Sequence, residues 1–95
     1  MKVRITQKTP QMSIDETFTG ETADDIVRAM QQKVADGVNF LLRPFVNSMS
    51  PVQFAQEVVR RYNDAYHKSI PLPQSSAEFL EQGEGEGIVT FLERP

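Results

Sequence analysis

The sequence contains no cysteine and no tryptophan, and it has a single histidine, His67. The absence of cysteine excludes disulfide bonds and thiolate metal sites, so the fold has to be held by an apolar core. No apolar run approaches the length of a bilayer-spanning helix, and the alternating start of the chain does not resemble the apolar segment of an export signal. We therefore expect a protein of the cytoplasm with no membrane partner.

Basic residues are also fewer than acidic ones. The 10 lysines and arginines stand against 13 aspartates and glutamates, which gives a formal net charge of −3. Binding to duplex DNA depends on a concentrated basic surface that displaces counterions from the phosphates, so the acidic balance predicts no duplex DNA partner. The 95 residues, of which 39% are hydrophobic, are typical of one folded domain over 1–95.

Two segments near the start of the chain alternate between apolar and polar residues, as half-buried strands do. They are 2–8 and 12–19, and a proline-containing turn separates them. The register that joins their apolar sides has three pairs: Val3 with Phe18, Ile5 with Glu16, and Gln7 with Ile14. The same register places Asp15 diagonal to Arg4 on the polar side. Glu16 is the exception on the apolar side, and a bulge, a sheet edge and a functional site all stay open as explanations.

An amphipathic pattern with the period of a helix begins after Thr22, which is a good N-cap residue. Gly37 offers a left-handed stop for this helix. The same apolar stripe would nevertheless continue through 38–45, and Pro44 should bend or end the helix in any case. The end of the helix therefore stays open between Gly37 and Pro44.

The clearest local signal is the Ser-Pro-Val-Gln sequence at 50–53. Its serine can cap a helix, its proline suits the first helical position and its glutamine completes a capping box. This helix should run to about His67. Prolines then keep 70–73 extended, and a second capping box at 75–78 opens a short third helix.

Three glycines interleaved with two glutamates over 83–87 predict a flexible turn, and the apolar, β-prone residues 88–92 predict the last strand. The expected order is β-β-α-α-α-β. It gives an α+β fold in which the N-terminal hairpin and the C-terminal strand form a small antiparallel sheet. Two main helices and the short third helix cover one face of this sheet.

No residue set for catalysis stands out. The serines lack the glycine-flanked elbow of a nucleophile, and a metal site at His67 would need carboxylates that no standard spacing supplies. The glycines at 83–87 run from a helix into a strand, which is the reverse of a phosphate-binding loop. We expect no metal and no cofactor, and the sequence favours a protein that is not an enzyme.

The best candidate for a binding surface lies in the second half of the helix that follows residue 50. It combines two cations, two phenol rings and the histidine: Arg60, Arg61, Tyr62, Tyr66 and His67. A ligand pocket would lie between this helix and the extended segment at 70–73. Plainer explanations also stay open, because the arginines can pair with Glu57 or Asp64, and a histidine suits the negative end of a helix dipole.

The densest apolar segment lies between the two main helices. Its large side chains are Phe40, Leu41, Leu42, Phe45 and Met49. They either complete the core or form an exposed patch that binds a partner. Burying one such side chain is worth about 1.5–3 kcal/mol, so a patch of several would favour a two-fold homodimer.

Two functions of different classes follow from these features. The first is a non-catalytic protein-interaction or regulatory module that works as a homodimer or with another protein. The second is a small-ligand-binding protein, or a minor enzyme, with a pocket near Tyr62, Tyr66 and His67. The sequence favours the first, because it lacks catalytic residue sets and has an apolar segment that needs covering.

Overall fold

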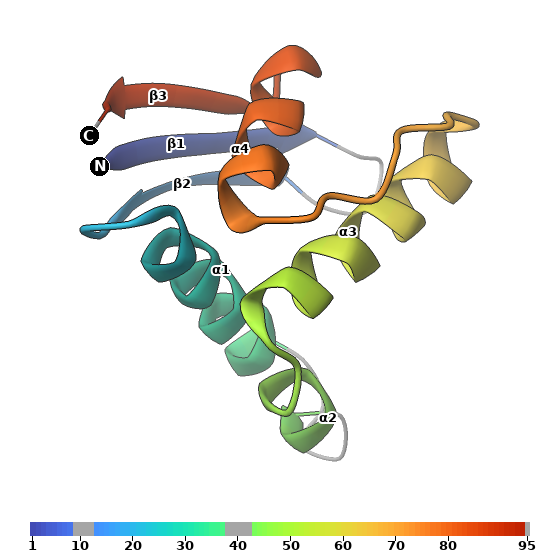
Figure 1. Cartoon of the computed structure of the whole chain (residues 1–95), viewed down its shortest axis with the longest axis horizontal. Helices are drawn as coiled ribbons and strands as arrows, with labels where there is room; N and C mark the ends of the chain where they lie inside the picture. Colours follow the sequence, from blue (N-terminus) through green and yellow to red (C-terminus); the bar gives the residue numbers. More distant parts are fainter. Residues whose placement is uncertain (9–12, 38–42, 95) are drawn as a thin grey trace.

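The computed structural model describes residues 1–8, 13–37 and 43–94, and it has the predicted α+β fold. Three antiparallel strands form a sheet in the order β2-β1-β3; they are β1 (Lys2–Lys8), β2 (Ser13–Thr19) and β3 (Val89–Glu93). The helices are α1 (Ala23–Gly37), α2 (Arg43–Asn47), α3 (Pro51–Tyr66) and α4 (Ser76–Gly85). Figure 1 shows β1 in the middle of the sheet, with α1 beside β2 and α4 beside β3.

The hairpin has the register that the apolar faces predict. Val3 lies opposite Phe18, and Ile5 lies opposite Glu16. On the polar face, Arg4 donates two hydrogen bonds to Asp15, from Nε to Oδ1 at 2.9 Å and from Nη2 to Oδ2 at 2.7 Å. This bidentate pair spans the two strands diagonally and supports the register.

Glu16, the misfit on the apolar face, is explained by an ion pair. Its Oε1 lies 3.3 Å from the Nζ of Lys33 on α1, and both side chains are largely exposed. The carboxylate therefore reaches past the core to the solvent edge of the helix, and the residue needs no bulge.

Helix α1 is described as far as Gly37, and residues 38–42, where a continuation would lie, are outside the described residues. A further short helix, α2, occupies part of the segment that we expect to link the two main helices. The order is thus β-β-α-α-α-α-β, with one helix more than predicted. Pro44 lies in the first turn of α2, where a missing N–H costs nothing. Of the predicted apolar segment, Phe40, Leu41 and Leu42 lie outside the described residues.

Helix α3 begins with the complete capping box that the sequence predicts. The Oγ of Ser50 accepts from the backbone N–H of Gln53 at 3.1 Å, and the Gln53 side chain accepts from the backbone N–H of Ser50 at 2.9 Å. The helix ends at Tyr66, and His67 takes the left-handed conformation after it, with φ of 54°.

Helix α4 is longer than predicted. Ser75 caps it as expected, but the helix continues through Gly83 and Gly85, where the sequence predicts a flexible turn. Tertiary packing overrides the poor helix propensity of glycine here: a Cβ on Gly83 would lie 2.5 Å from Cγ2 of Val89, so only glycine lets α4 approach β3 so closely. The turn itself is reduced to residues 86–88, with Gly87 at φ of 77°.

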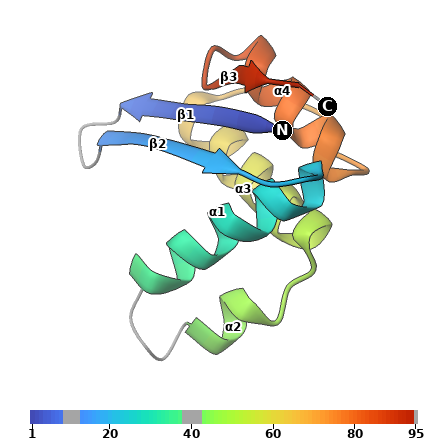
Figure 2. The same ribbon diagram turned by 90° about the vertical axis from the view of Figure 1, so that its left-hand side faces the viewer.

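The core lies between the sheet and the helices, and Figure 2 shows α1 and α3 crossing beneath the strands. Its buried apolar side chains are Val3, Ile5, Ile26, Val27, Ala35, Val46, Phe54, Ala55, Val59, Phe79, Leu80 and Val89. Among the described residues, no helix is both long and apolar enough to cross a membrane.

Candidate functional site

An apolar cavity of about 170 Å³ lies where the sheet, α1, α3 and α4 meet. The sheet contributes Ile5 and Val89, and α1 contributes Met30 and Val34. Helix α3 adds Val58 and the ring of Tyr62. The sheet and the three helices each turn an apolar face inward. Where they meet, their side chains do not fill the space completely, and this space is the cavity.

Gln82 of α4 lines this cavity and carries a buried polar atom without a partner among the described residues. Its Nε2 donates to the backbone oxygen of Pro71 at 2.9 Å. Its Oε1 is buried and has no hydrogen-bond partner among the described residues. A buried acceptor without a donor costs about 1–3 kcal/mol, so this atom would gain from a bound group that supplies an N–H or O–H.

A polar cluster of Tyr62, Lys68 and Glu86 stands beside the cavity. The Tyr62 hydroxyl donates to Oε1 of Glu86 at 2.9 Å, and the Lys68 ammonium donates to the same oxygen. The ammonium also lies 5.8 Å from the centre of the Tyr62 ring, within reach of a cation–π interaction. Two residues of this cluster, Tyr62 and Glu86, line the cavity.

The cluster shifts the proton affinities of its members. The hydrogen bond from Lys68, followed by the one from Tyr62, lowers the pKa of the Glu86 carboxyl below its ordinary value. Burial, followed by the hydrogen bond to Glu86, raises the pKa of the Tyr62 hydroxyl. The hydrogen bond to Glu86 also raises the pKa of Lys68. At neutral pH, the cluster is therefore a protonated phenol and an ammonium sharing one carboxylate.

The structure brings together only part of the predicted site at the end of α3. The rings of Tyr62 and Tyr66 are in contact, with centroids 4.7 Å apart. Tyr66 is 40% exposed, however, and neither Tyr66 nor His67 lines the cavity. The pocket is therefore on the inner side of Tyr62 and extends under the sheet, rather than lying between α3 and residues 70–73 alone.

The two predicted arginines are placed away from the cavity. Arg60 and Arg61 are both exposed, and both pair with Glu57 on the same helix, at 3.3 and 3.2 Å. Side chains three and four residues apart meet on a helix surface, so this arrangement follows from spacing alone. It corresponds to the plainer of the two explanations for these residues.

Sequence reasoning missed Gln82 and Glu86. Both lie at the end of α4, in and beside the glycine-rich stretch that propensity assigns to a turn. At 75–78 the structure shows only the Ser75 half of the predicted capping box. The available signal was the spacing of four residues between Gln82 and Glu86, which places both on one face of a helix that continues past Gly83.

The predicted interface segment is only partly described. Phe45 on α2 is 64% exposed, the largest exposed fraction of any large apolar side chain in the described part of the chain. Met49 is partly buried and packs against the core, and Val46 is buried. Of the described apolar residues of this segment, Phe45 is therefore turned to solvent, whereas Val46 and Met49 are turned to the core.

Within residues 1–8, 13–37 and 43–94, no group of three or more histidine, aspartate or glutamate side chains is arranged to hold a metal ion. A comparison of the chain with models of protein families, with curated proteins and with solved structures found no match.

Proposed function

We propose that this protein is a non-catalytic interaction module that receives one aromatic side chain of a partner protein in the apolar cavity. The observation that carries the proposal is that Gln82, which lines a cavity of about 170 Å³, has a buried Oε1 with no hydrogen-bond donor among the described residues. A cavity of about 150 Å³ with apolar walls accepts benzene. An aromatic ring that also carries an N–H or O–H, such as that of tryptophan or tyrosine, satisfies both the volume and the acceptor.

The surroundings of the cavity support a partner that is a protein. Val34 lines the cavity and is 43% exposed, and Tyr66, at 40% exposure, extends the apolar surface beyond Tyr62. Glu86 and Lys68 add a charged pair beside it. An aromatic anchor in a pocket, surrounded by apolar contacts and a polar rim, is the arrangement that carries most of the binding energy at protein interfaces.

The cavity can be tested with indole, which has both the ring and the donor, and with benzofuran, which has the same shape but no N–H. We expect both to shift the NMR signals of cavity residues, with indole binding about threefold to tenfold more tightly because of the hydrogen bond to Gln82. Substituting Gln82→Met should remove this preference. The proposal would be contradicted if neither indole nor benzofuran binds.

The second part of the experiment fills the cavity with a larger side chain of the protein itself. Val58→Phe should abolish indole binding, whereas Val52→Phe, on the same helix but outside the cavity lining, should leave it unchanged. N-acetyltryptophanamide tests whether the mouth admits a ring attached to a backbone. If indole binds and N-acetyltryptophanamide does not, the site is one for a free small ligand, and the interaction proposal is wrong.

Self-association is a second candidate function, and the exposure of Phe45 favours it. A phenylalanine that is 64% exposed beside a buried Val46 is a surface that a two-fold contact would cover. The proposed setting for either function is the cytoplasm.

A further inference from the structure

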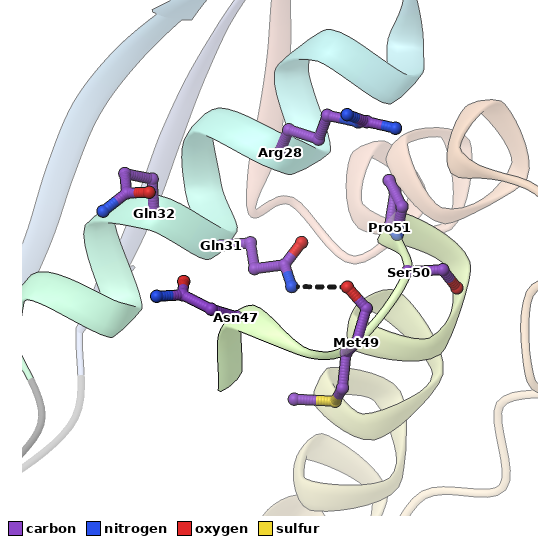
Figure 3. A pocket seen from close by; sticks show the side chains of 7 residues that line it. All are labelled: Arg28, Gln31, Gln32, Asn47, Met49, Ser50 and Pro51. Carbon is purple, nitrogen blue, oxygen red and sulfur yellow. Dashed lines mark hydrogen bonds between the residues drawn. The ribbon is translucent and has the colours of Figure 1, made fainter. Parts of the chain in front are cut away.

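A second cavity, of about 350 Å³, lies between α1 and the segment that joins α2 to α3. It shares no residue with the apolar cavity, and polar side chains dominate its wall (Figure 3). Helix α1 contributes Arg28, Gln31 and Gln32, and the opposite wall holds Asn47 and Ser50.

Gln31 is the buried member of this set, with only 7% of its surface exposed. Its Nε2 donates to the backbone oxygens of Val46 at 2.7 Å and Met49 at 2.8 Å, so both of its N–H groups are used. Because an amide is planar, these two bonds also fix the direction of Oε1. In Figure 3 this oxygen points away from Met49, into the space between Arg28 and Pro51.

The fixed oxygen of Gln31 is an acceptor without a protein donor. No side chain or backbone group among the described residues donates a hydrogen bond to it. An acceptor that is oriented by two hydrogen bonds and faces a cavity is suited to bind a ligand N–H.

Arg28 supplies a positive charge next to this acceptor. It forms no ion pair with any residue in the described parts of the chain. The carboxylates one turn before it have other partners: Asp24 accepts from Ser76, and Asp25 accepts from the backbone N–H groups of Glu21 and Thr22. Its guanidinium is therefore available for an anion, and residues three apart on a helix lie side by side.

We propose that this cavity binds an α-carboxylate together with the N–H on the adjoining carbon. The guanidinium of Arg28 takes the carboxylate, and Oε1 of Gln31 accepts from the N–H. A multiply charged phosphate suits the site less well, because the Gln31 oxygen would repel it and Arg28 is the single cation among the described residues that line the cavity. The same chemistry occurs in a free amino acid and at the carboxy-terminus of a peptide.

The test uses the whole chain and a matched set of small probes, with binding followed by NMR. N-acetylglycine has both groups, N-acetylsarcosine lacks the N–H, and N-acetylglycinamide lacks the carboxylate. We expect N-acetylglycine to perturb the signals of residues 28–32 and 47–50. N-acetylsarcosine should bind about threefold to tenfold more weakly, and N-acetylglycinamide, which loses the charged contact, at least about tenfold more weakly. Glycine and acetyl-alanyl-alanine distinguish the two sources, since the tighter binder identifies either a free amino acid or a peptide end.

Two arginine variants make the result specific. Arg28→Gln should weaken N-acetylglycine binding at least tenfold without disturbing the fold, because the side chain is exposed and unpaired among the described residues. Arg61→Gln removes an exposed arginine from another face and should change nothing. The proposal is wrong if no carboxylate probe perturbs these residues, if Arg28→Gln binds as well as the parent, or if N-acetylsarcosine equals N-acetylglycine.

Discussion

At the scale of single residues, Gly83 and Gly85 differ in what surrounds them, although both lie in the last turns of α4. A Cβ at Gly83 would meet Cγ2 of Val89 at 2.5 Å, whereas a Cβ at Gly85 would have nothing within 4 Å. We expect Gly83→Ala to lower the free energy of unfolding by about 1–3 kcal/mol, because Val89 is buried and cannot move aside.

Gly85→Ala is the matched control for this substitution. Alanine is the better helix former, so this variant should raise the free energy of unfolding by up to about 1 kcal/mol. Urea denaturation followed by circular dichroism measures both variants. Equal effects of the two substitutions would contradict the close packing of α4 on β3.

Glu86 makes the stability of the folded protein depend on pH. Its pKa is lowered in the folded protein, chiefly by the hydrogen bond from Lys68, so its stabilising contribution is complete above the ordinary carboxyl pKa. This contribution is lost as the pH falls through the lowered folded value. The affected range therefore begins near the ordinary glutamate pKa of about 4.3 and extends below it.

We expect Glu86→Gln to flatten the acid side of the stability curve relative to the parent protein. Glu84→Gln is the control, since Glu84 pairs with Arg94 and leaves the Tyr62 cluster intact. The measurement is the free energy of unfolding at several pH values between neutrality and the acid transition. If the slope of the Glu86→Gln curve below about pH 4.3 equals that of the parent, the cluster does not stabilise the fold.

At the scale of elements, the start of α3 depends on a few adjacent residues. Ser50→Ala removes the acceptor for the Gln53 N–H and should lower the free energy of unfolding by about 1 kcal/mol. Ser69→Ala, at an exposed position outside any helix, is the control and should have no measurable effect. Thermal and urea unfolding of both variants test this, and an unchanged Ser50→Ala midpoint would contradict the cap.

Elements of this kind could be predicted because their signals are local. A capping box requires residues three apart, and the hairpin register follows from matching two alternating faces, which is why both Ser50 and the pairing of Val3 with Phe18 were predicted correctly. The extent of α4 could not be predicted, since two glycines argue against a helix and only the approach of Val89 explains the first of them.

The candidate site was harder to predict than the elements, because it is made by their packing. Tyr62 was identified from its neighbours on one helix face. Gln82 is notable because its side-chain oxygen has no hydrogen-bond donor among the described residues. Gln31 is notable because its amide donates to the backbone oxygens of Val46, in α2, and Met49, after α2. No pattern of spacing in the sequence encodes either circumstance.

At the scale of the whole molecule, the exposed Phe45 predicts concentration-dependent self-association. We expect light scattering to give a mass that rises from monomer to dimer in the micromolar range, and Phe45→Ser to shift this transition to higher concentration. Tyr66→Ser is the control, since it removes another exposed aromatic ring from a different helix. A parent protein that stays monomeric at high micromolar concentration would exclude the homodimer.

The position of β1 in the sheet has a consequence for the order of events during synthesis. This strand is made well before one of its two neighbours, β3, because the paired residues are far apart in the sequence: Val3 lies opposite Phe91, and Lys2 lies opposite Glu93. While the ribosome extends the chain, the hairpin exists with one row of backbone N–H and C=O groups unpaired. Such a long-range pairing forms slowly. Until β3 is in place, β1 is an edge strand of the nascent chain and can pair with a strand of another chain.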